Sequence, residues 1–323
     1  MLSRRHILAG AAVLAAPSFA RAQAGWPGER PIDMIVPYPP GGGVDTMARL
    51  VMPHVMKHLG RNARSVVSNR GGAGGQVGFE YGFNAAPDGY TLCAVTLPAI
   101  STFPLERSVR YRPLDFSFLA NVVDDPNTIY VAANSPLRTL ADLVAAAKAR
   151  PGELSYGTTG IGSDDHILML NFEAIAGIPE MTHVPFAGAA PLMTQILGGH
   201  LPLGVANMAE IYAGLREGQL RSLGQAAEQR WQATPDVPTF REQGFDLVGG
   251  SARGIVGPPG LPEPIRTALE RAFTAALADP EFLREAERVG LPLRPAVGTA
   301  YRAMAASTDE QVKALWQRRP WNR

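Results

Sequence analysis

The sequence predicts an α/β protein of two lobes, each with a parallel-type sheet covered by helices. Short apolar runs rich in β-branched residues alternate with segments in which apolar residues recur every three or four positions. After a first series of strands and helices, this alternation starts again at Asn127. Such alternation is typical of parallel sheets with both faces covered. The 323 residues, with 46% hydrophobic content, are sufficient for two cores.

The first 24 residues are predicted to be an export signal rather than part of the fold. A basic start precedes an apolar run from Ile7 to Ala16, and small residues precede candidate cleavage sites after Ala22 and Ala24. The apolar run is too short to span a membrane. The Arg4–Arg5 pair fits a twin-arginine signal and an ordinary secretory signal equally well. Either signal predicts an exported, periplasmic product.

The first lobe is predicted to comprise residues 25–125 and 240–323. Ile32–Tyr38 is read as a strand. A helix follows, in which apolar residues recur every four positions from Met47 to Leu59, with a kink or a break expected at Pro53. Further strands are predicted in RSVVSNR, YTLCAVT and FSFLANVV, with a small-residue helix after GGAGGQVG. Three helical stretches are predicted to complete the chain.

The second lobe is predicted to comprise residues 126–239. Its expected strands are NTIYVAAN, ELSYGTT, MTHVPF, LPLGVANM and LRSLGQAAE. Its expected helices are TLADLVAAAKAR, which Thr139 would cap, DDHILMLNFEAIAG and APLMTQILGG. The apolar run Gly254–Gly257 could return the chain to the first lobe and so give two crossover segments. Hinges between the lobes are expected near Asp124–Thr128 and Gly224–Gly250.

Each lobe has a glycine-rich loop between a strand and a helix. The first glycine loop is Ile35–Asp45 (IVPYPPGGGVD), and the second glycine loop is Gly157–His166 (GTTGIGSDDH). Ligands of open α/β sheets bind where strands end and helices begin, because helix N-termini expose unpaired N–H groups and partial positive charge. Glycines let a ligand approach the backbone, and Thr158, Thr159 and Ser163 add hydroxyls. Either loop alone could be a structural turn, but the two together favour a small anion in a cleft.

Composition and motifs argue against several other classes of function. The net charge of +1 gives no attraction to nucleic acid or to an anionic membrane. The chain has neither a Gly-Lys pair nor a G-x-G-x-x-G fingerprint, so no nucleotide cofactor is expected. A single cysteine excludes an internal disulfide, and Asp164, Asp165, His166 and His183 lack a recognised metal-ligand spacing. An exported α/β hydrolase or transferase using Ser163 with a histidine is the alternative, although no G-x-S-x-G elbow is present.

A set of motifs in a fixed order carries a resemblance to a known family. Between about Ile32 and Pro264 the chain contains, in order, IVPYPPGGGVDTMAR, NRGGAGGQVG, APDGYTL, LSYGTTGIGSDDH, HVPFAGAAP, ILGGHL, PDVPTF and PPGLPEPI. Together they resemble the Bug-type periplasmic receptors, the solute-binding proteins of tripartite tricarboxylate transporters. The resemblance implies a monomeric, two-lobed periplasmic binding protein (Venus flytrap) with two crossover segments, no cofactor and no catalysis. It also implies a small carboxylate ligand that is delivered to a membrane permease or detected by a sensor.

The motifs also indicate which residues would contact the ligand in such a receptor. In the first lobe these are Tyr38, Pro40, Gly41, Gly42, Asp45 and Thr96. In the second lobe they are Thr158, Gly162, Ser163, Asp165, His166, Ala187 and Asn207.

This chain departs from the family pattern at three charged residues. Arg253 stands where many relatives have an aromatic residue, and Asp164 and Asp165 stand where many have uncharged polar residues. Our hypothesis is that Arg253 enters the cleft and either binds the ligand carboxylate or pairs with Asp164 or Asp165. The alternative is a solvated arginine beside two aspartates that favour the helix dipole. Two carboxylates near the cleft argue against a trianion such as citrate, and a monocarboxylate with an amine or a hydroxyl fits better.

Overall fold

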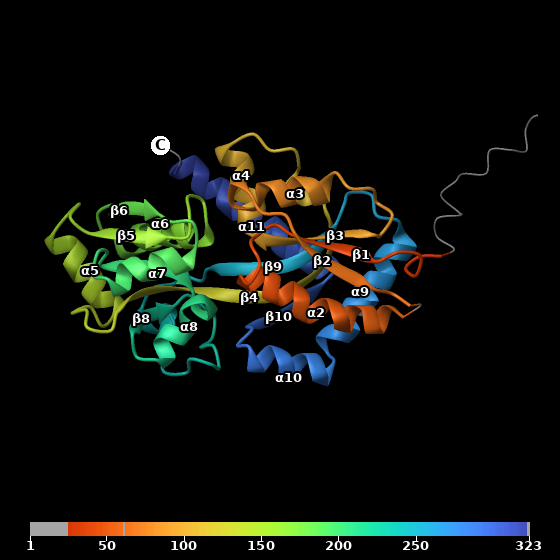
Figure 1. Cartoon of the computed structure of the whole chain (residues 1–323). Coiled ribbons are helices and arrows are strands. Elements are labelled where there is room, and N and C mark those ends of the chain that lie inside the picture. The colour runs from red at the N-terminus through yellow and green to blue at the C-terminus, as the bar shows by residue number, and fades with distance from the viewer. Residues whose placement is uncertain (1–24, 61, 322–323) are drawn as a thin grey trace, which may run out of the picture.

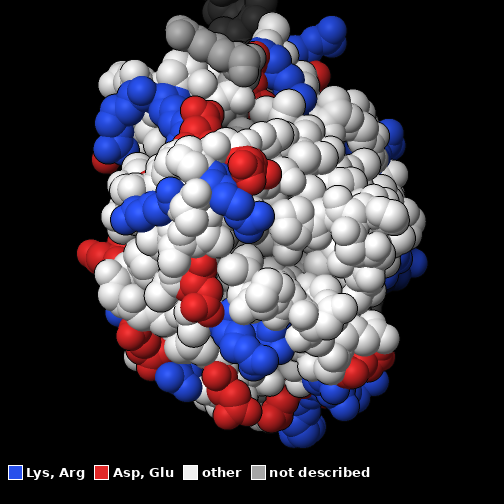
Figure 2. Space-filling model, turned by 90° about the vertical axis from the view of Figure 1, so that its left-hand side faces the viewer, with Lys and Arg blue, Asp and Glu red and all other residues white. Residues whose placement is uncertain are grey.

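The computed structural model describes residues 25–60 and 62–321, which form two lobes side by side (Figure 1). The expected export signal, residues 1–24, lies outside the described residues. Among the residues described, none of the helices combines the length and the apolar character that a membrane span requires. Figure 2 looks onto the outer end of the second lobe, where basic and acidic side chains are interspersed.

The first lobe is a mixed sheet between two layers of helices. Its parallel part consists of β2 (Ser65–Asn69), β1 (Ile32–Val36) and β3 (Thr91–Leu97). Three antiparallel strands complete it, namely β9 (Gly250–Gly257), the first part of β4 (Ser117–Ala132) and β10 (Leu293–Val297). The covering helices are α2 (Gly43–Leu59), α9 (Glu263–Leu277) and α10 (Pro280–Arg288) on one face, and α3 (Gln76–Phe83), α4 (Ala99–Glu106) and α11 (Thr299–Arg318) on the other.

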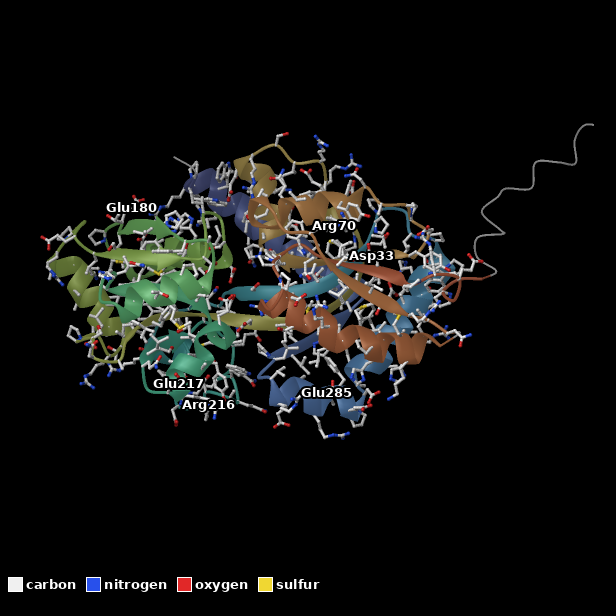
Figure 3. The ribbon with its side chains drawn as sticks, in the orientation of Figure 1. Asp33, Arg70, Glu180, Arg216, Glu217 and Glu285 are labelled. Atoms are coloured by element: carbon white, nitrogen blue, oxygen red, sulfur yellow. The ribbon has the colours of Figure 1, made fainter. Side chains whose placement is uncertain are left out.

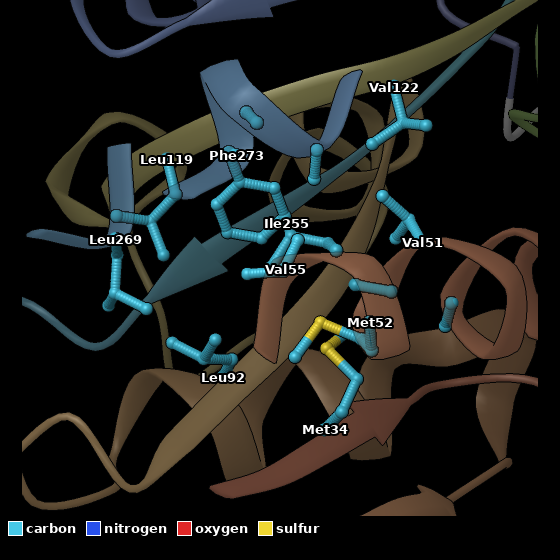
Figure 4. Close-up of a cluster of buried hydrophobic side chains, with 14 of the residues drawn as sticks. Met34, Val51, Met52, Val55, Leu92, Leu119, Val122, Ile255, Leu269 and Phe273 are labelled. Atoms are coloured by element: carbon cyan, nitrogen blue, oxygen red, sulfur yellow. The ribbon is translucent and has the colours of Figure 1, made fainter. Parts of the chain in front are cut away.

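The largest core lies between α2, α9 and this sheet. Figure 4 shows Met34 of β1 and Ile255 of β9 among side chains of α2 and α9 such as Val55 and Phe273, all of them fully buried. Burying a side chain of this size stabilises the fold by roughly 1.5–3 kcal/mol. α2 continues through Pro53 as one helix of 17 residues, so the expectation of a break there is wrong.

The second lobe repeats this arrangement on a smaller scale. β7 (Leu203–Asn207), β5 (Ser155–Thr158) and β6 (Thr182–Pro185) are parallel, and β8 (Leu220–Gln225) and the end of β4 complete the lobe with antiparallel pairs. α5 (Leu140–Ala149) and α6 (Asp164–Ala176) cover one face, while α7 (Ala189–Leu197) and α8 (Met208–Arg216) cover the other. Single-turn 3-10 segments occur at Ala73–Gly75, Pro113–Asp115 and Arg241–Gln243. The sequence analysis did not predict α4 or α8.

Two strands join the lobes. β4 is one strand of 16 residues, whereas the sequence predicted two separate strands in this region. Residues 117–126 pair with β9, and residues 127–132 pair with β7 and β8, so the strand exchanges partners just after Pro126 without ending. β9 pairs with both β3 and β4, which confirms the expected return of the chain to the first lobe. Because these crossing strands run antiparallel to their neighbours, neither sheet is purely parallel. The lobe boundaries and hinges given above stay predictions.

The C-terminal end of the described chain also reaches from the first lobe to the second. Arg319, just after α11, forms ion pairs with Glu173 at 2.7 Å and with Glu180 at 2.9 Å, both in the second lobe. Glu180 is labelled in Figure 3, on the side of that lobe toward which α11 extends. The Trp321 indole donates a hydrogen bond of 2.7 Å to Glu106 at the end of α4. Leu170 of α6 is buried against this segment.

Candidate ligand-binding site

A cleft of about 2200 Å³ lies between the lobes and receives loops from both of them. The carboxyl ends of β1 and β5, where the two glycine loops begin, open into it. β9 and the start of α8 contribute side chains between the loops. Ten of the expected contact residues line the cleft, namely Tyr38, Pro40, Gly41, Gly42, Thr96, Ser163, His166, Ala187, Asn207 and Arg253. Four do not, namely Asp45, Thr158, Gly162 and Asp165.

The first glycine loop presents main-chain N–H groups to the cleft. Gly42 is the N-cap of α2 and makes no side-chain capping bond. Within the described chain, the amides of Gly42, Gly43 and Val44 donate to no other residue. Gly41 adopts a φ of 83°, which a glycine accepts without strain. The positive end of α2 is therefore open to a ligand.

Asp45 has a structural role in this loop. Its side chain is only 3% exposed, and its carboxylate accepts hydrogen bonds from the Gly41 amide, Arg49 and Asn69, each at 2.9 Å. Burial alone would raise the pKa of Asp45, but the bonds from Arg49, Gly41 and Asn69 outweigh it and hold the pKa below its usual value. Asp45 therefore fixes the shape of the loop while facing away from the cleft.

The second glycine loop uses its hydroxyls within the protein. Ser163 caps α6, since its Oγ accepts from the His166 amide at 3.2 Å and donates to the Gly160 carbonyl at 2.9 Å. Thr158 Oγ1 lies 2.7 Å from His183 Nε2. The imidazole rings of His166 and His183 stack with their centroids 3.8 Å apart. Burial lowers the pKa of His166 to about 3 and that of His183 to about 4. Both rings are thus neutral near pH 7, and in the described chain neither forms a hydrogen bond with the Ser163 hydroxyl.

The buried Asp165 side chain holds the second glycine loop by hydrogen bonds. It is completely buried, and its carboxylate accepts from both the amide and the hydroxyl of Thr159 and from Asn127 Nδ2. The Gly162 amide donates to His166 Nδ1 at 3.2 Å. Thr158, Gly162 and Asp165 therefore hold the loop in shape through internal hydrogen bonds and do not line the cleft.

Arg253 lines the cleft, but its ion-pair partner is neither Asp164 nor Asp165. It is 3% exposed, its Nη2 forms an ion pair with Asp125 Oδ2 at 3.0 Å, and the same nitrogen donates to Asn207 Oδ1 at 3.2 Å. The hypothesis of a direct pair with Asp164 or Asp165 is therefore wrong, and so is the alternative of a solvated side chain. Asp125 lies on β4 just before the strand changes lobes, which brings it within reach of β9.

Asn207 connects Arg253 to two further carboxylates that line the cleft. Its Nδ2 donates to Asp164 Oδ2 at 2.8 Å, and its main-chain amide donates to Glu210 Oε2 at 3.2 Å. We call Asp125, Asp164, Asn207, Glu210 and Arg253 the Asn207 cluster. It combines one guanidinium with three carboxylates at the junction of the two lobes.

Burial dominates the protonation of these acids. Desolvation raises the pKa of Asp125 to about 6 although Arg253 opposes the shift, and it raises the pKa of Glu210 to about 7. The pKa values of Asp164 and Asp165 are also raised, first by burial and, for Asp165, then by the nearby Asp164 charge. The cluster thus holds more acid than its single guanidinium can neutralise.

The sequence analysis missed Glu210 and Asp125. Glu210 had a readable signal, because Asn207 and Glu210 form a capping box at the start of α8. No sequence signal could have identified Asp125, because only the pairing of β4 with β9 brings it to Arg253.

Comparisons with known proteins agree with this architecture. Residues 47–319 match the family model described as tripartite tricarboxylate transporter family receptor. The chain is 33% identical to Protein BugT of Bordetella pertussis, over 77% of this chain and 76% of that protein. A ligand-free TctC solute-binding protein from Polaromonas superposes with a TM-score of 0.76 at 32% identity, over 91% of this chain and 100% of the other. MatC from Rhodopseudomonas palustris, solved with bound malate, superposes with a TM-score of 0.77 at 26% identity. The match covers 89% of this chain and 99% of MatC.

The family model covers most of the chain, and the two lobes, the crossing strands and the cleft between them are those of a binding protein. Ser163 has no histidine relay in the described chain, and the relatives are solute-binding receptors, so the hydrolase or transferase alternative is not supported. The chain belongs to the family of tripartite tricarboxylate transporter receptors, which are solute-binding proteins of the Bug type and not enzymes.

Proposed function

We propose that this protein captures a small organic carboxylate in the cleft between its lobes, in the periplasm, and presents it to a membrane permease or to a sensor. The observation that carries the proposal is the open N-terminus of α2, where Gly42, Gly43 and Val44 line the cleft and their amides donate to no other residue of the described chain. An anion at such a site gains roughly 0.3–1 kcal/mol from the helix dipole, and up to about 2 kcal/mol when it is partly buried. The malate bound by MatC is a ligand of the same chemical class.

Arg253 is placed to bind the same ligand carboxylate as the amides at the start of α2. A Cβ atom added to Gly43 would lie 2.2 Å from Arg253 Nη1, so this nitrogen sits directly beside the start of α2. Nη2 holds Asp125 and Asn207, whereas Nη1 donates to no residue of the described chain. Its free N–H groups and the loop amides could hold one carboxylate together. Closure of the lobes over it would be a hinge motion biased by contacts to both sides.

Thermal unfolding with a panel of carboxylates, malate and adipate included, tests the proposal. A true ligand at 100 times its dissociation constant should stabilise the folded state by about 2.7 kcal/mol. Gly43→Ala should reduce affinity at least tenfold because its methyl group displaces Arg253 Nη1. Gly71→Ala is the matched control, since Gly71 lies outside the cleft lining and its Cβ would make only ordinary contacts, at 3.8 Å from Pro39 and Tyr38. Absence of stabilisation by every carboxylate would refute the proposed function.

The cellular part of the proposal has its own test. Fractionation of cells expressing the full chain should place the protein in the periplasm. Mass spectrometry of its N-terminus should show cleavage after Ala22 or Ala24. An uncleaved product retained in the cytoplasm would contradict this part without affecting the ligand site.

A further inference from the structure

The cleft has two neighbouring regions of opposite charge preference, which we call its two ends and which meet at Asn207. One end is the start of α2 with Arg253 Nη1, described above as a site for an anion. The other end is formed by Asp164 at the start of α6 and Glu210 at the start of α8, which both line the cleft. Asn207 lies between the two ends and is hydrogen-bonded to Arg253, Asp164 and Glu210.

Each of the two acids keeps one oxygen available. Asp164 uses Oδ2 to accept from Asn127 at 2.6 Å and from Asn207 at 2.8 Å, while Oδ1 accepts from no other residue of the described chain. Glu210 uses Oε2 to accept from the Asn207 amide, and its Oε1 is likewise without a donor in this part of the chain. Both residues are only half-buried, and both line the cleft.

The nearby cation does not satisfy these oxygens. Arg253 pairs with Asp125 and donates to Asn207, and among the described residues no ion pair joins a lysine or arginine to Asp164 or Glu210. A second positive charge is therefore missing from the cluster, and a ligand can supply it.

We propose, as a refinement that rests on the proposed carboxylate-receptor function, that the ligand is an amino carboxylate. Its carboxylate binds the α2 amides and Arg253 Nη1, and its protonated amine binds Asp164 Oδ1 and Glu210 Oε1. An ammonium group has three donors and no acceptor, which suits two carboxylate oxygens. Charge-assisted bonds of this kind are roughly twice as strong as neutral ones.

The proposal predicts opposite pH dependences for two kinds of ligand. Burial raises the pKa of Glu210 to about 7, so this acid is largely protonated at pH 5 and mostly ionised at pH 8, and burial also raises the pKa of Asp164. A cationic amine requires the ionised acids, so its affinity should rise as pH increases from 5 to 8. A plain carboxylate is repelled by the ionised acids, so its affinity should fall over the same range. The titratable groups facing these two acids are Arg253 of β9, Asp125 of β4, Asp165 of α6 and the Tyr38 hydroxyl of the first glycine loop, which stays protonated over this range.

Titration calorimetry with matched pairs of ligands tests the proposal. Glycine, 3-aminopropanoate, 4-aminobutanoate and 5-aminopentanoate are compared with acetate, propanoate, butanoate and pentanoate, and with malate as a further plain carboxylate. At least one amino carboxylate should bind ten times more tightly than its amine-free partner at pH 8, with the preference shrinking at pH 5. If plain carboxylates bind and no amino carboxylate is preferred, the refinement fails and the receptor function stands. If none of these compounds binds, both proposals fail.

Variants locate the amine within the cleft. Asp164→Asn can keep an oxygen toward Asn127 and Asn207 but loses the charge, so the amino-carboxylate preference should fall at least tenfold while the plain carboxylate binds as well or better. Glu210→Gln should act in the same direction. Glu180→Gln is the matched control, because Glu180 also lines the cleft but pairs with Arg319, outside the Asn207 cluster. An unchanged preference in both Asp164→Asn and Glu210→Gln would overturn the proposal.

Discussion

The two glycine loops occupy equivalent positions in their lobes and present different chemistry. In the first glycine loop the amides of Gly42, Gly43 and Val44 have no partner within the described residues, and the carboxylate of Asp45 is turned inward onto Arg49 and Asn69. In the second glycine loop the hydroxyls of Thr158, Thr159 and Ser163 are hydrogen-bonded within the protein, and a carboxylate, Asp164, lines the cleft instead.

This difference shows that a polar, glycine-rich loop at a helix start is not by itself a site for an anion. What matters is which groups remain unpartnered after the loop has satisfied its own hydrogen bonds. The first lobe offers N–H donors and the second lobe offers a carboxylate oxygen, so the two lobes present unlike groups to the cleft. Arg253 and Asn207 link these surfaces, and the following predictions test that contrast from the largest expected effect to the smallest.

Removing the guanidinium should have the largest effect. Arg253→Ala leaves Asp125 buried without its cation, which should lower the free energy of unfolding by about 3–5 kcal/mol and abolish carboxylate binding. Urea denaturation and titration calorimetry measure the two effects. The double variant Arg253→Met, Asp125→Asn removes both charges and should recover much of the stability without recovering the binding. Full binding by the double variant would show that Arg253 serves only to neutralise Asp125.

Acid should weaken the second glycine loop through His166. This ring is 4% exposed and has a pKa lowered by burial to about 3, so it stays neutral in the folded protein while its unfolded counterpart is protonated below pH 6.5. The unfolded state then binds more protons, and stability falls as pH decreases from about 6.5. For one histidine the loss at pH 5 is about 2 kcal/mol. The difference in unfolding free energy between pH 7.5 and pH 5 should be smaller by about this amount in His166→Gln, and an equal difference in both proteins would contradict a neutral, buried ring.

The smallest effect is expected at Ser163. Because its hydroxyl caps α6 internally, Ser163→Ala should cost about 1 kcal/mol of stability. Carboxylate affinity should change less than twofold, in contrast to the tenfold loss expected for Gly43→Ala in the other loop. Ser163→Thr retains a hydroxyl and serves as the control for stability. A large loss of affinity in Ser163→Ala alone would mean that the two loops are more alike than their hydrogen bonds indicate.

The sequence was informative about the first glycine loop and less so about the second. The unpaired amides of Gly42 to Val44 follow from local rules, because a helix start without a capping side chain leaves its N–H groups free. The partner of Thr158 comes from tertiary packing, since His183 lies on a strand 25 positions later. The partner of Thr159 is Asp165 of the same loop, but the inward turn of Asp165 is set by its burial and its bond to Asn127 of β4.

The same distinction holds for the strands and for the Asn207 cluster. The runs FSFLANVV and NTIYVAAN were each recognised as β-structure, but their fusion into β4 depends on having different partners at its two ends. Asp125, which pairs with Arg253, and Glu210, which is bonded to Asn207, lie on elements far apart in the chain, and no local pattern encodes their meeting with Arg253. Local propensity predicted the elements, whereas the charges that meet in the cleft depended on topology.

The position of Trp321 allows intrinsic tryptophan fluorescence to report on the arrangement of the lobes. This indole lines the cleft, is hydrogen-bonded to Glu106 and is packed at 4.7 Å against Trp316, where α11 reaches the second lobe. Any rotation of one lobe against the other alters the surroundings of this ring pair, so emission intensity and wavelength can follow closure without a label.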